Sequence, residues 1–561
     1  MSTPTAGKSA EMTALRVGLV TPCLVCLLSN YRADILCIGT SRLLAPAIPK
    51  KRSLHLHLHA TRPMAMESLT STNTVDRAAP PPRPHVVLVA SPGAGHLIPM
   101  AELARRLVAR HGLAATVVTF PDPSAPSAAA PSSVLSSLGA AGVSTAALPA
   151  VALDDLPVDA HIETVLLELI GRSIPHLRAM LRDIRSSARL AALVPDFFCS
   201  TVLPLAAEPG LPAYIFFPGN LTTLSLMRSA VELNDGAAPG ELRDLPADAL
   251  RLPGGVSLRR EDYGDGFRDS KQPVYAHLIE EGRRYRAADG FLVNTFHEIE
   301  PGNVEDLKQV VEQGTFPPAY PVGPLVRPSF GEDDVSLACF EWLDRQPAGS
   351  VVYVSFGSAG ALSAEQTAEL AAGLEHSGHR FLWVVRMPSL DGANNNFAAM
   401  DNKDDPLAWL PKGFLERTSS RGLAVAAWAP QVRVLSHSAT VAFVSHCGWN
   451  STLESVANGV PMIAWPLYAE QGVNATVLSE NVGVALRLRA RADGLVAREE
   501  ITAAVRELMD GEEKGRAVRC RARDLQRAAA HACAPGGSSW QMLEEVAGKW
   551  KAAALGRQQE Q

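Results

Sequence analysis

The sequence predicts an α/β protein built from two doubly wound, Rossmann-like domains that face each other across a cleft. Three observations predict this fold class. The chain has 561 residues, of which 47% are hydrophobic and 20% are charged, so it has apolar material for more than one core. Short apolar strands alternate with amphipathic helices over residues 85–294, and a second alternation begins at residue 351. Such alternation is typical of parallel sheets that are covered by helices on both faces.

The composition excludes several classes of protein. Disorder over the whole length is excluded, because disordered chains are poor in apolar residues. The net charge of −6 makes a nucleic-acid partner unexpected. Eight cysteines without a dense pattern argue against a disulfide scaffold and for a reducing compartment, so we expect a cytoplasmic protein. No apolar run reaches the roughly 18 to 20 residues that span a bilayer, and we expect no stable membrane insertion.

The N-terminal extension, residues 1–81, differs from the rest of the chain and is expected to be disordered. Residues 1–65 hold eight Lys or Arg but only two acidic residues. The segment is interpreted as an upstream extension whose working start is Met64 or Met66, with an organelle transit peptide or a secretory signal as alternatives. The lone Cys-x-x-Cys and the Leu-His repeat within it have no partner ligands at metal spacing.

The first alternation opens with a βαβ unit. The strand His85–Ala90 is followed by the turn Ser91–Gly95, a helix over His96–Arg110 and a second strand over Ala114–Phe120. Parallel strands need such a crossover helix, so this order predicts a parallel sheet. Further strands are expected at 191–195, 213–217 and 290–294, with helices at Ile162–Ile184 and Val274–Tyr285.

A linker is predicted where Pro321–Leu325 and the polar residues Arg327–Asp334 separate the two alternations. We therefore divide the chain into a first Rossmann-like domain (82–325), a second Rossmann-like domain (326–539) and a C-terminal helix with its tail (540–561). The elements expected in the second part are strands at 351–355, 380–385, 423–427, 441–445 and 461–465, helices at 363–377, 498–509, 515–533 and 538–552, and an exposed loop at 387–406.

The segment from Trp428 to Gln471 has the chemistry of a nucleotide-sugar site. A strand ends at His446-Cys-Gly448, where the glycine lets a ligand approach the backbone, and a helix is expected to begin at Trp449–Ser451. The free N–H groups and the positive dipole end of that helix favour a phosphate. The side chains supply donors for the phosphates, an acceptor for the ribose hydroxyls, a flat face for the base and a polar pair for the sugar. In that order, these are His446, Asn450 and Ser451; Glu454; Trp428; and Glu470 with Gln471.

Each of these residues alone has an ordinary structural explanation, but their combination resembles the plant secondary product glycosyltransferase box. That box is the donor signature of the plant UDP-dependent glycosyltransferases, and Trp428 and Gln471 are its first and last residues. The resemblance covers about residues 82–555. The segments PRPHVVLVASPGAGHLIPM, DPLAWLPKGFLERT and PLYAEQ resemble the hydroquinone and monolignol glucosyltransferase branch.

The resemblance implies a GT-B fold in which the domain at 82–325 binds the acceptor, the domain at 326–539 binds the UDP-sugar, and the C-terminal helix crosses back to the N-terminal domain. It also implies that Trp428 and Gln431 contact uracil, that Ala429 and Gly448 belong to the donor site, and that Trp449 contributes through its backbone. Gln471 favours glucose over galactose in such enzymes. The family resemblance further suggests that Ser358, in the turn Gly357–Gly360, contacts the diphosphate; an ordinary βα turn is the alternative.

The predicted base is His96, which follows the first strand at the cleft. A histidine suits deprotonation of a phenol or alcohol because its pKa lies near working pH, and it needs a carboxylate to orient its ring. Asp196 follows the strand at 191–195 and is expected on the same side of the same sheet. By resemblance, these two residues are the catalytic base and its supporting aspartate.

Other ligands are not expected. Gly93 and Gly95 form only G-x-G, which falls short of a dinucleotide fingerprint and argues against NAD. We find no Asp-x-Asp and no cluster at metal spacing, so we expect no metal and no cofactor besides the UDP-sugar substrate. Sequons occur at Asn220, Asn450 and Asn474. A glycan on Asn450 would block the donor site, so function and a secretory route are hard to reconcile.

The sequence thus predicts a monomeric inverting transferase that moves glucose from UDP-glucose to a small phenolic acceptor. Hydroquinone, monolignol and xenobiotic acceptors fit, and flavonoids or another UDP-sugar stay open. The alternatives are a catalytically silent nucleotide-sugar binder and, more remotely, a nucleotide-dependent oxidoreductase. Phe197, Phe198, Phe216 and Phe217 are candidates for the acceptor pocket, or equally for the core.

Overall fold

The computed structural model describes residues 82–121, 129–157, 160–238, 240–327, 334–389 and 405–559. All the elements below belong to the unit Ala79–Gln561. The predictions for the N-terminal extension, and for most of the loop at 387–406, lie outside the described residues.

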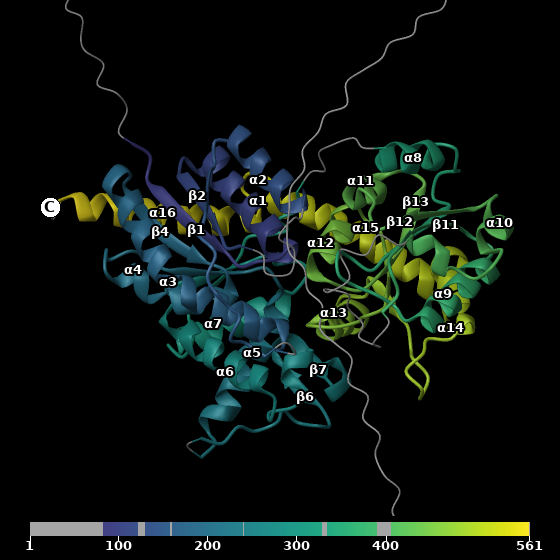
Figure 1. Ribbon diagram of the computed structural model, residues 1–561, viewed down its shortest axis with the longest axis horizontal. Helices are drawn as coiled ribbons and strands as arrows, with labels where there is room; N and C mark the ends of the chain where they lie inside the picture. Colours follow the sequence, from purple (N-terminus) through teal and green to yellow (C-terminus); the bar gives the residue numbers. More distant parts are fainter. Residues whose placement is uncertain are drawn as a thin grey trace, which may run out of the picture. The chain divides into compact units, whose positions relative to one another are not determined.

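The first half of this unit, from β1 to β9, is built on a parallel sheet (Figure 1). Its strands come in the order β3-β2-β1-β4, and a second parallel set has the order β5-β8-β9. Isolated parallel bridges from Leu193 to Ala213 and from Asp196 to Phe216 join β4 to β5, so the two sets continue as one layer. The bounds are β1 His85–Ala90, β2 Ala114–Thr119, β3 Ser144–Ala147, β4 Leu190–Pro195, β5 Tyr214–Phe217, β8 Gly290–Val293 and β9 Ala319–Pro321.

Helices and one short hairpin complete this half. The hairpin joins β6 (Leu250–Leu252) to β7 (Val256–Leu258), which pair antiparallel. The helices are α1 Ala94–His111, α2 Ala129–Ala140, α3 Ile162–Ser187, α4 Pro204–Ala207, α5 Leu221–Asp235, α6 Pro273–Arg284 and α7 Pro301–Glu312.

A second parallel sheet forms the other half, in the order β12-β11-β10-β13-β14-β15. Its strands are β10 Val351–Ser355, β11 Arg380–Val385, β12 Gly422–Ala426, β13 Thr440–Ser445, β14 Met462–Ala464 and β15 Ala485–Arg487. Its helices are α8 Asp334–Leu343, α9 Ala364–Ser377, α10 Phe414–Thr418, α11 Gln431–Ser436, α12 Trp449–Ala457, α13 Gln471–Thr476, α14 Arg498–Asp510 and α15 Lys514–Cys533.

The strands at the centre of both sheets are apolar runs because both of their faces are covered. Val86 and Val87 in β1, and Val351 and Val352 in β10, are fully buried. Neighbouring side chains on a strand point to opposite faces, so burial of both requires layers on both sides of the sheet. This pattern confirms the two parallel α/β layers that the sequence predicts.

The last helix, α16 (Ser538–Gln559), follows α15 of the second half but packs on the first sheet. Figure 1 shows it as the yellow helix that runs past β4. The buried ring of Trp550 meets Tyr214 edge-on at 5.4 Å. Lys549 Nζ donates to Tyr320 Oη at 2.7 Å, and Arg557 Nη2 donates to the Leu190 carbonyl at 2.8 Å. The chain therefore binds its two halves together at its C-terminal end.

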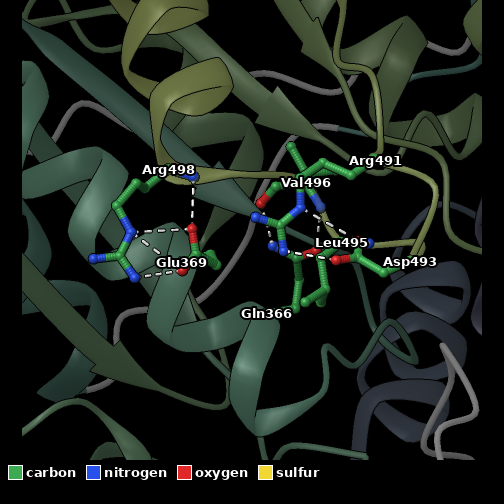
Figure 2. Close-up of polar contacts among 7 residues, drawn as sticks. All are labelled: Gln366, Glu369, Arg491, Asp493, Leu495, Val496 and Arg498. Carbon is green, nitrogen blue, oxygen red and sulfur yellow. Dashed lines mark hydrogen bonds and ion pairs between the residues drawn. The ribbon is translucent and has the colours of Figure 1, made fainter.

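Polar contacts attach α14 to α9 on the second sheet (Figure 2). The Gln366 side chain donates to the Val496 carbonyl at 2.9 Å and accepts the Val496 N–H at 2.8 Å. Glu369 forms an ion pair with Arg498, the first residue of α14, and also accepts its N–H at 2.7 Å. These contacts fix the start of α14 against the helix that follows β10.

The structure corrects the first part of the predicted linker, Pro321–Leu325, whereas residues 328–333 of its polar part lie outside the described residues. Pro321 ends strand β9, and Val322 and Leu325 are buried, so this segment is part of the first half. The short strands β3, β9 and β15 were also not predicted, because three or four residues show too little periodicity.

Candidate active site

The carboxyl edge of the first sheet brings His96 and Asp196 together. Strands β1 and β4 pair in parallel, so the residues that follow them lie at the same edge. Gly93, with a φ of 106°, caps α1, and His96 is the third residue of that helix. Asp196 follows β4 directly. His96 Nδ1 lies 3.1 Å from both carboxylate oxygens of Asp196.

The Asp196 carboxylate is completely buried and has its hydrogen bonds inside the protein. Its Oδ1 accepts from Ser91 Oγ at 2.6 Å and from the Phe198 N–H at 3.3 Å, as well as from His96. Burial alone would lower the pKa of His96, but the charge and the hydrogen bond of Asp196, together with the charges of Glu470 and Glu163, outweigh it and raise that pKa. An imidazole whose Nδ1–H faces a carboxylate keeps its lone pair on Nε2, as a general base requires.

Two of the four candidate phenylalanines lie beside this pair. The ring of Phe197 stacks on the His96 ring at 5.5 Å, and Phe198 lies at the same distance with a tilted ring. Phe216 and Phe217 belong to buried strand β5 and are core residues. The short 3-10 helix Phe197–Val202, which Asp196 caps, therefore places two aromatic rings beside His96.

The residues of the predicted donor site lie on the carboxyl side of the second sheet. Ser358 is exposed in the turn after β10, and Trp428, 52% exposed, follows β12 next to buried Ala429. Gln431 begins α11. His446 and Gly448 lead from β13 into α12, and this helix holds Trp449, Asn450, Ser451 and Glu454. Glu470 caps α13, and Gln471 begins it.

His446 occupies a slot between two glycines. A Cβ on Gly357 would lie 2.6 Å from His446 Nε2, and a Cβ on Gly448 would lie 2.5 Å from the same atom. Gly448 is thus needed for the imidazole as well as for the expected approach of a ligand. Burial lowers the pKa of His446 to about 4, and its Nδ1 is buried without a hydrogen-bond partner in the described part of the chain. This side chain is therefore a neutral hydrogen-bonding group at the start of α12.

A small network joins α11 to α12. Gln431 Nε2 donates to Ser451 Oγ at 2.8 Å and to Glu454 Oε2 at 2.7 Å. Burial raises the pKa of Glu454 to about 7, although the Gln431 hydrogen bond acts in the opposite direction. The network connects three of the predicted donor residues, and neither of these two hydrogen bonds uses the second carboxylate oxygen of Glu454.

Two residues at the start of α12 contact the first half directly. Asn450 Nδ2 donates to the Gly95 carbonyl, next to His96, at 2.8 Å. Trp449 Nε1 donates to the Asn294 carbonyl at 2.7 Å, and its ring is buried, as the expected backbone role requires. The Asn450 amide that we assigned to a phosphate thus already has a partner. These contacts place the start of α12 beside the His96 turn.

Similarity to known proteins decides the family. The model of the family described as UDP-glucoronosyl and UDP-glucosyl transferase matches residues 332–520. Hydroquinone glucosyltransferase of Rauvolfia serpentina is 46% identical over 468 residues, which cover 83% of this chain and 98% of the relative. The chain belongs to the UDP-glycosyltransferase family.

Solved structures of this family share the fold of this UDP-glycosyltransferase. A UDP-glucosyltransferase from Polygonum tinctorium capable of glucosylating indoxyl, solved with 3,4-dichloroaniline, is 41% identical with a TM-score of 0.75; the match covers 84% of this chain and 99% of that chain. Phytolacca americana UGT2, solved with UDP-2fluoro-glucose and pterostilbene, is 40% identical with a TM-score of 0.74, covering 83% and 99%. The predicted GT-B class, with two Rossmann-like domains, is confirmed, and so is the predicted family.

Three further observations bear on ligands of this UDP-glycosyltransferase. Within the described ranges, no group of three or more His, Cys, Asp or Glu could hold a metal ion. Over the same residues, no helix is both long and apolar enough to cross a bilayer. The sequon residues Asn220 and Asn474 are fully buried and hydrogen-bonded to each other at 2.6 Å, so neither can carry a glycan in this fold.

Sequence reasoning missed two residues of the first half that lie near His96 or act on it electrostatically. Ser91 donates to Asp196, and its position in the turn after β1 was a usable signal. Glu163, in the first turn of α3, interacts electrostatically with His96 and Glu470. Burial, together with Asp265 and Glu470, raises the pKa of Glu163 to about 7. Nothing in the sequence pattern marks it, because α3 lies far from both motifs along the chain.

Proposed function

We propose that this enzyme transfers glucose from UDP-glucose to a hydroxyl of a small phenolic acceptor, with inversion at the anomeric carbon. The observation that carries the proposal is the buried Asp196 carboxylate on His96 Nδ1, beside the donor-box helix α12. The phenolic class is supported by two similar proteins, the hydroquinone glucosyltransferase and the structure that holds pterostilbene.

His96 and Asp196 perform the proton transfer. His96 Nε2 takes the proton of the acceptor hydroxyl while the acceptor oxygen forms a bond to the anomeric carbon. The bond from that carbon to the UDP oxygen breaks, and the electron pair leaves with UDP. Asp196 holds the ring and stabilises the imidazolium that forms.

The donor residues position UDP-glucose and stabilise the leaving diphosphate. Trp428, with Ala429 beside it, and Gln431 contact the uracil, Glu454 the ribose, and Glu470 and Gln471 the glucose. The diphosphate lies at the start of α12, where backbone N–H groups at Gly448 and Trp449 and the positive helix end favour negative charge. His446 contributes there as a neutral donor, together with Ser451, Ser358 and the Asn450 segment. UDP-glucose is a substrate in this scheme, and the residues call for no cofactor.

We also propose that the enzyme acts as a monomer in the cytoplasm. One chain supplies both halves of the site, so catalysis needs no second copy. The described cysteines are free, which suits a reducing compartment. The acceptor could equally be a larger phenol such as a flavonoid, and the assay below distinguishes these acceptors.

The proposal is tested by measuring UDP release from UDP-glucose with a panel of simple phenols and flavonoids. The full chain is compared with His96→Ala and with His379→Ala, which removes an exposed His–Asp pair of 3.0 Å. We expect a loss of about 100-fold or more in the first variant and wild-type turnover in the second. Equal activity of His96→Ala would overturn the mechanism. UDP binding without turnover on any acceptor would favour a silent binder, and NAD(H) binding without UDP would favour an oxidoreductase.

A further inference from the structure

The segment that carries Glu470 and Gln471 is held by a loop from the other half of the enzyme. Ala469 has a φ of 52°, in the left-handed region that costs a non-glycine residue roughly 1 kcal/mol or more. Its N–H donates to Asp265 Oδ2 at 3.0 Å. Asp265 begins the short 3-10 helix Asp265–Phe267, after the β6–β7 hairpin in the first half. We call this first half the acceptor half, because it holds the proposed base, and the half with the donor box the donor half. Both proposed sugar contacts, Glu470 and Gln471, come directly after Ala469.

The two backbones touch at the same place. A Cβ on Gly264 would lie 3.1 Å from the Ala469 carbonyl oxygen, and a Cβ on Gly472 would lie 2.6 Å from the Asp262 carbonyl oxygen. Each glycine therefore allows the other chain segment to approach. Figure 1 shows α13, which Gln471 begins, beside α5 and the β6–β7 hairpin. The contact is a close fit between two loops of different halves.

A buried ion pair supports the fit from behind. Asp262 is fully buried, and Arg487 Nη2, from β15 of the donor half, lies 2.7 Å from its Oδ1. The other oxygen of Asp262 accepts the Arg259 N–H at 2.9 Å. Because both charges are paired, the loop is fixed on the donor half at a second point, next to Asp265.

The N–H groups ahead of Glu470 have two kinds of partner. Gln471 Oε1 accepts the N–H groups of Leu467 and Tyr468, at 2.9 and 3.1 Å, so the donor half satisfies these two itself. The next N–H, that of Ala469, bonds to the acceptor half. Loss of Asp265 would leave this N–H without its partner and the left-handed backbone without support.

We propose that Asp265 is a positioning residue for donor-sugar recognition. Through Ala469 it fixes Glu470 and Gln471, so the sugar subsite is complete only when the acceptor half is in place. The proposed contacts for uracil, ribose and diphosphate lie on other segments of the donor half. The inference rests on the proposed sugar contacts of Glu470 and Gln471. It predicts that Asp265 affects UDP-glucose and leaves UDP almost unaffected.

The test compares Asp265→Ala and Asp265→Asn with Asp269→Ala in the full chain. Asparagine keeps an oxygen that can accept the Ala469 N–H. Asp269 is an exposed acid in the same loop that accepts only local N–H groups. Dissociation constants of UDP and of UDP-glucose are measured by calorimetry, and KM for UDP-glucose and for UDP-galactose by UDP release.

For Asp265→Ala we expect UDP-glucose to bind about 5-fold more weakly or worse, while the affinity for UDP changes by less than about 2-fold. The preference for UDP-glucose over UDP-galactose should also be reduced. Asp265→Asn and Asp269→Ala should stay close to wild type. The inference would be overturned if Asp265→Ala weakened the binding of UDP and of UDP-glucose equally. It would also be overturned if Asp265→Asn bound UDP-glucose as weakly as Asp265→Ala. Failure of the proposed function looks different, because wild-type protein would then bind UDP and show no UDP-glucose binding or no turnover.

Discussion

The catalytic pair and the donor box differ in how their polar groups are satisfied. Asp196 accepts hydrogen bonds from Ser91, His96 and the Phe198 backbone, all within the acceptor half. In the donor half, the buried Nδ1 of His446 has no partner among the described residues, and Trp428 exposes half of its surface. A buried polar atom without a partner carries a free-energy cost that a ligand can offset.

This difference shows which side chains are oriented by the protein itself and which have groups left for a ligand. The base is oriented before any ligand binds, because a buried carboxylate fixes the imidazole. The donor residues offer groups that a nucleotide would satisfy. We therefore expect changes at the His96–Asp196 pair to alter proton transfer and changes in the donor box to alter UDP affinity.

The largest effect is expected from Asp196→Asn. Without the carboxylate the ring loses its orientation, so kcat should fall by roughly 100-fold or more. Asp196 also raises the pKa of His96, and activity requires the neutral ring, so wild-type activity is lost as pH falls through that raised pKa. In the variant burial dominates, and the acid limb of kcat/KM should move to lower pH. The profile is measured from pH 5 to 9 with a phenol acceptor.

The matched control is Asp344→Asn, which alters an exposed pair with His437 at 3.1 Å. It should leave both rate and profile unchanged. UDP affinity should be the same in all three proteins. An acid limb that stays in place in Asp196→Asn would show that this carboxylate does not set the protonation of the base.

The next largest effect is expected from Gly448→Ala in the donor half. The new Cβ would meet His446 Nε2 at 2.5 Å, and the backbone of Gly357 also lies close to this ring, so the imidazole has to move. UDP should bind about 10-fold more weakly or worse, while the acid limb of the residual activity stays at its wild-type pH. Calorimetry with UDP gives the affinity, and a thermal melt reports whether overpacking destabilises the fold, by about 1 to 3 kcal/mol.

Gly548→Ala is the control, since nothing lies within 4 Å of a Cβ at that position of α16. It should bind UDP like the wild type. If Gly448→Ala also kept wild-type UDP affinity, the placement of His446 at the diphosphate would be wrong.

Much of the fold, and the positions of the proposed catalytic pair and the donor box, could be predicted from the sequence. The strands around His96 and around the box are long apolar runs with clear turns, so the order of strands and helices follows from periodicity. Parallel pairing then brings Asp196 to His96, although 100 residues separate them. The predicted start of the helix at Trp449 is also where the structure has it.

Contacts between the halves could not be predicted in the same way. The partners of Asn450 and Ala469 are Gly95 and Asp265, and no local pattern links residues so far apart. The slot for His446 depends on two glycines that are 91 residues apart and meet only in the folded chain. Such contacts depend on how loops pack, which neither propensity nor periodicity encodes.

A smaller effect is expected from pH on the donor half. Burial raises the pKa of Glu454 to about 7, so the carboxylate is protonated below neutral pH and accepts ribose hydroxyls less well. Wild-type UDP affinity should fall several-fold from pH 8 to pH 6. Glu454→Gln should bind more weakly at pH 8 and show less of this decline. Because UDP titrates identically with both proteins, the difference between their calorimetric curves isolates Glu454; parallel curves would contradict its role.

The smallest effect concerns Glu163, an acidic residue of the acceptor half that, unlike Asp196, has a buried oxygen, Oε2, without a hydrogen-bond partner among the described residues. Burial and the charges of Asp265 and Glu470 raise its pKa to about 7, against the opposing influence of His96. The folded pKa lies above the unfolded value, so ionisation costs stability as pH rises from about 4.5 to 7.

Glu163→Gln removes this cost, and the variant should gain stability over the wild type at pH 8 and gain little at pH 5. The side chain is partly exposed, so we expect a difference of about 1 kcal/mol between the two pH values. Denaturant unfolding at both pH values measures it, with Glu208→Gln, an exposed acid, as the control. A gain confined to high pH would mean that the acceptor half also holds an unsatisfied group beside its base, one that an acceptor hydroxyl could meet. An equal change in the free energy of unfolding at both pH values would show that ionisation of Glu163 costs no stability. The contrast between the His96–Asp196 pair and the donor box would then need no exception at Glu163.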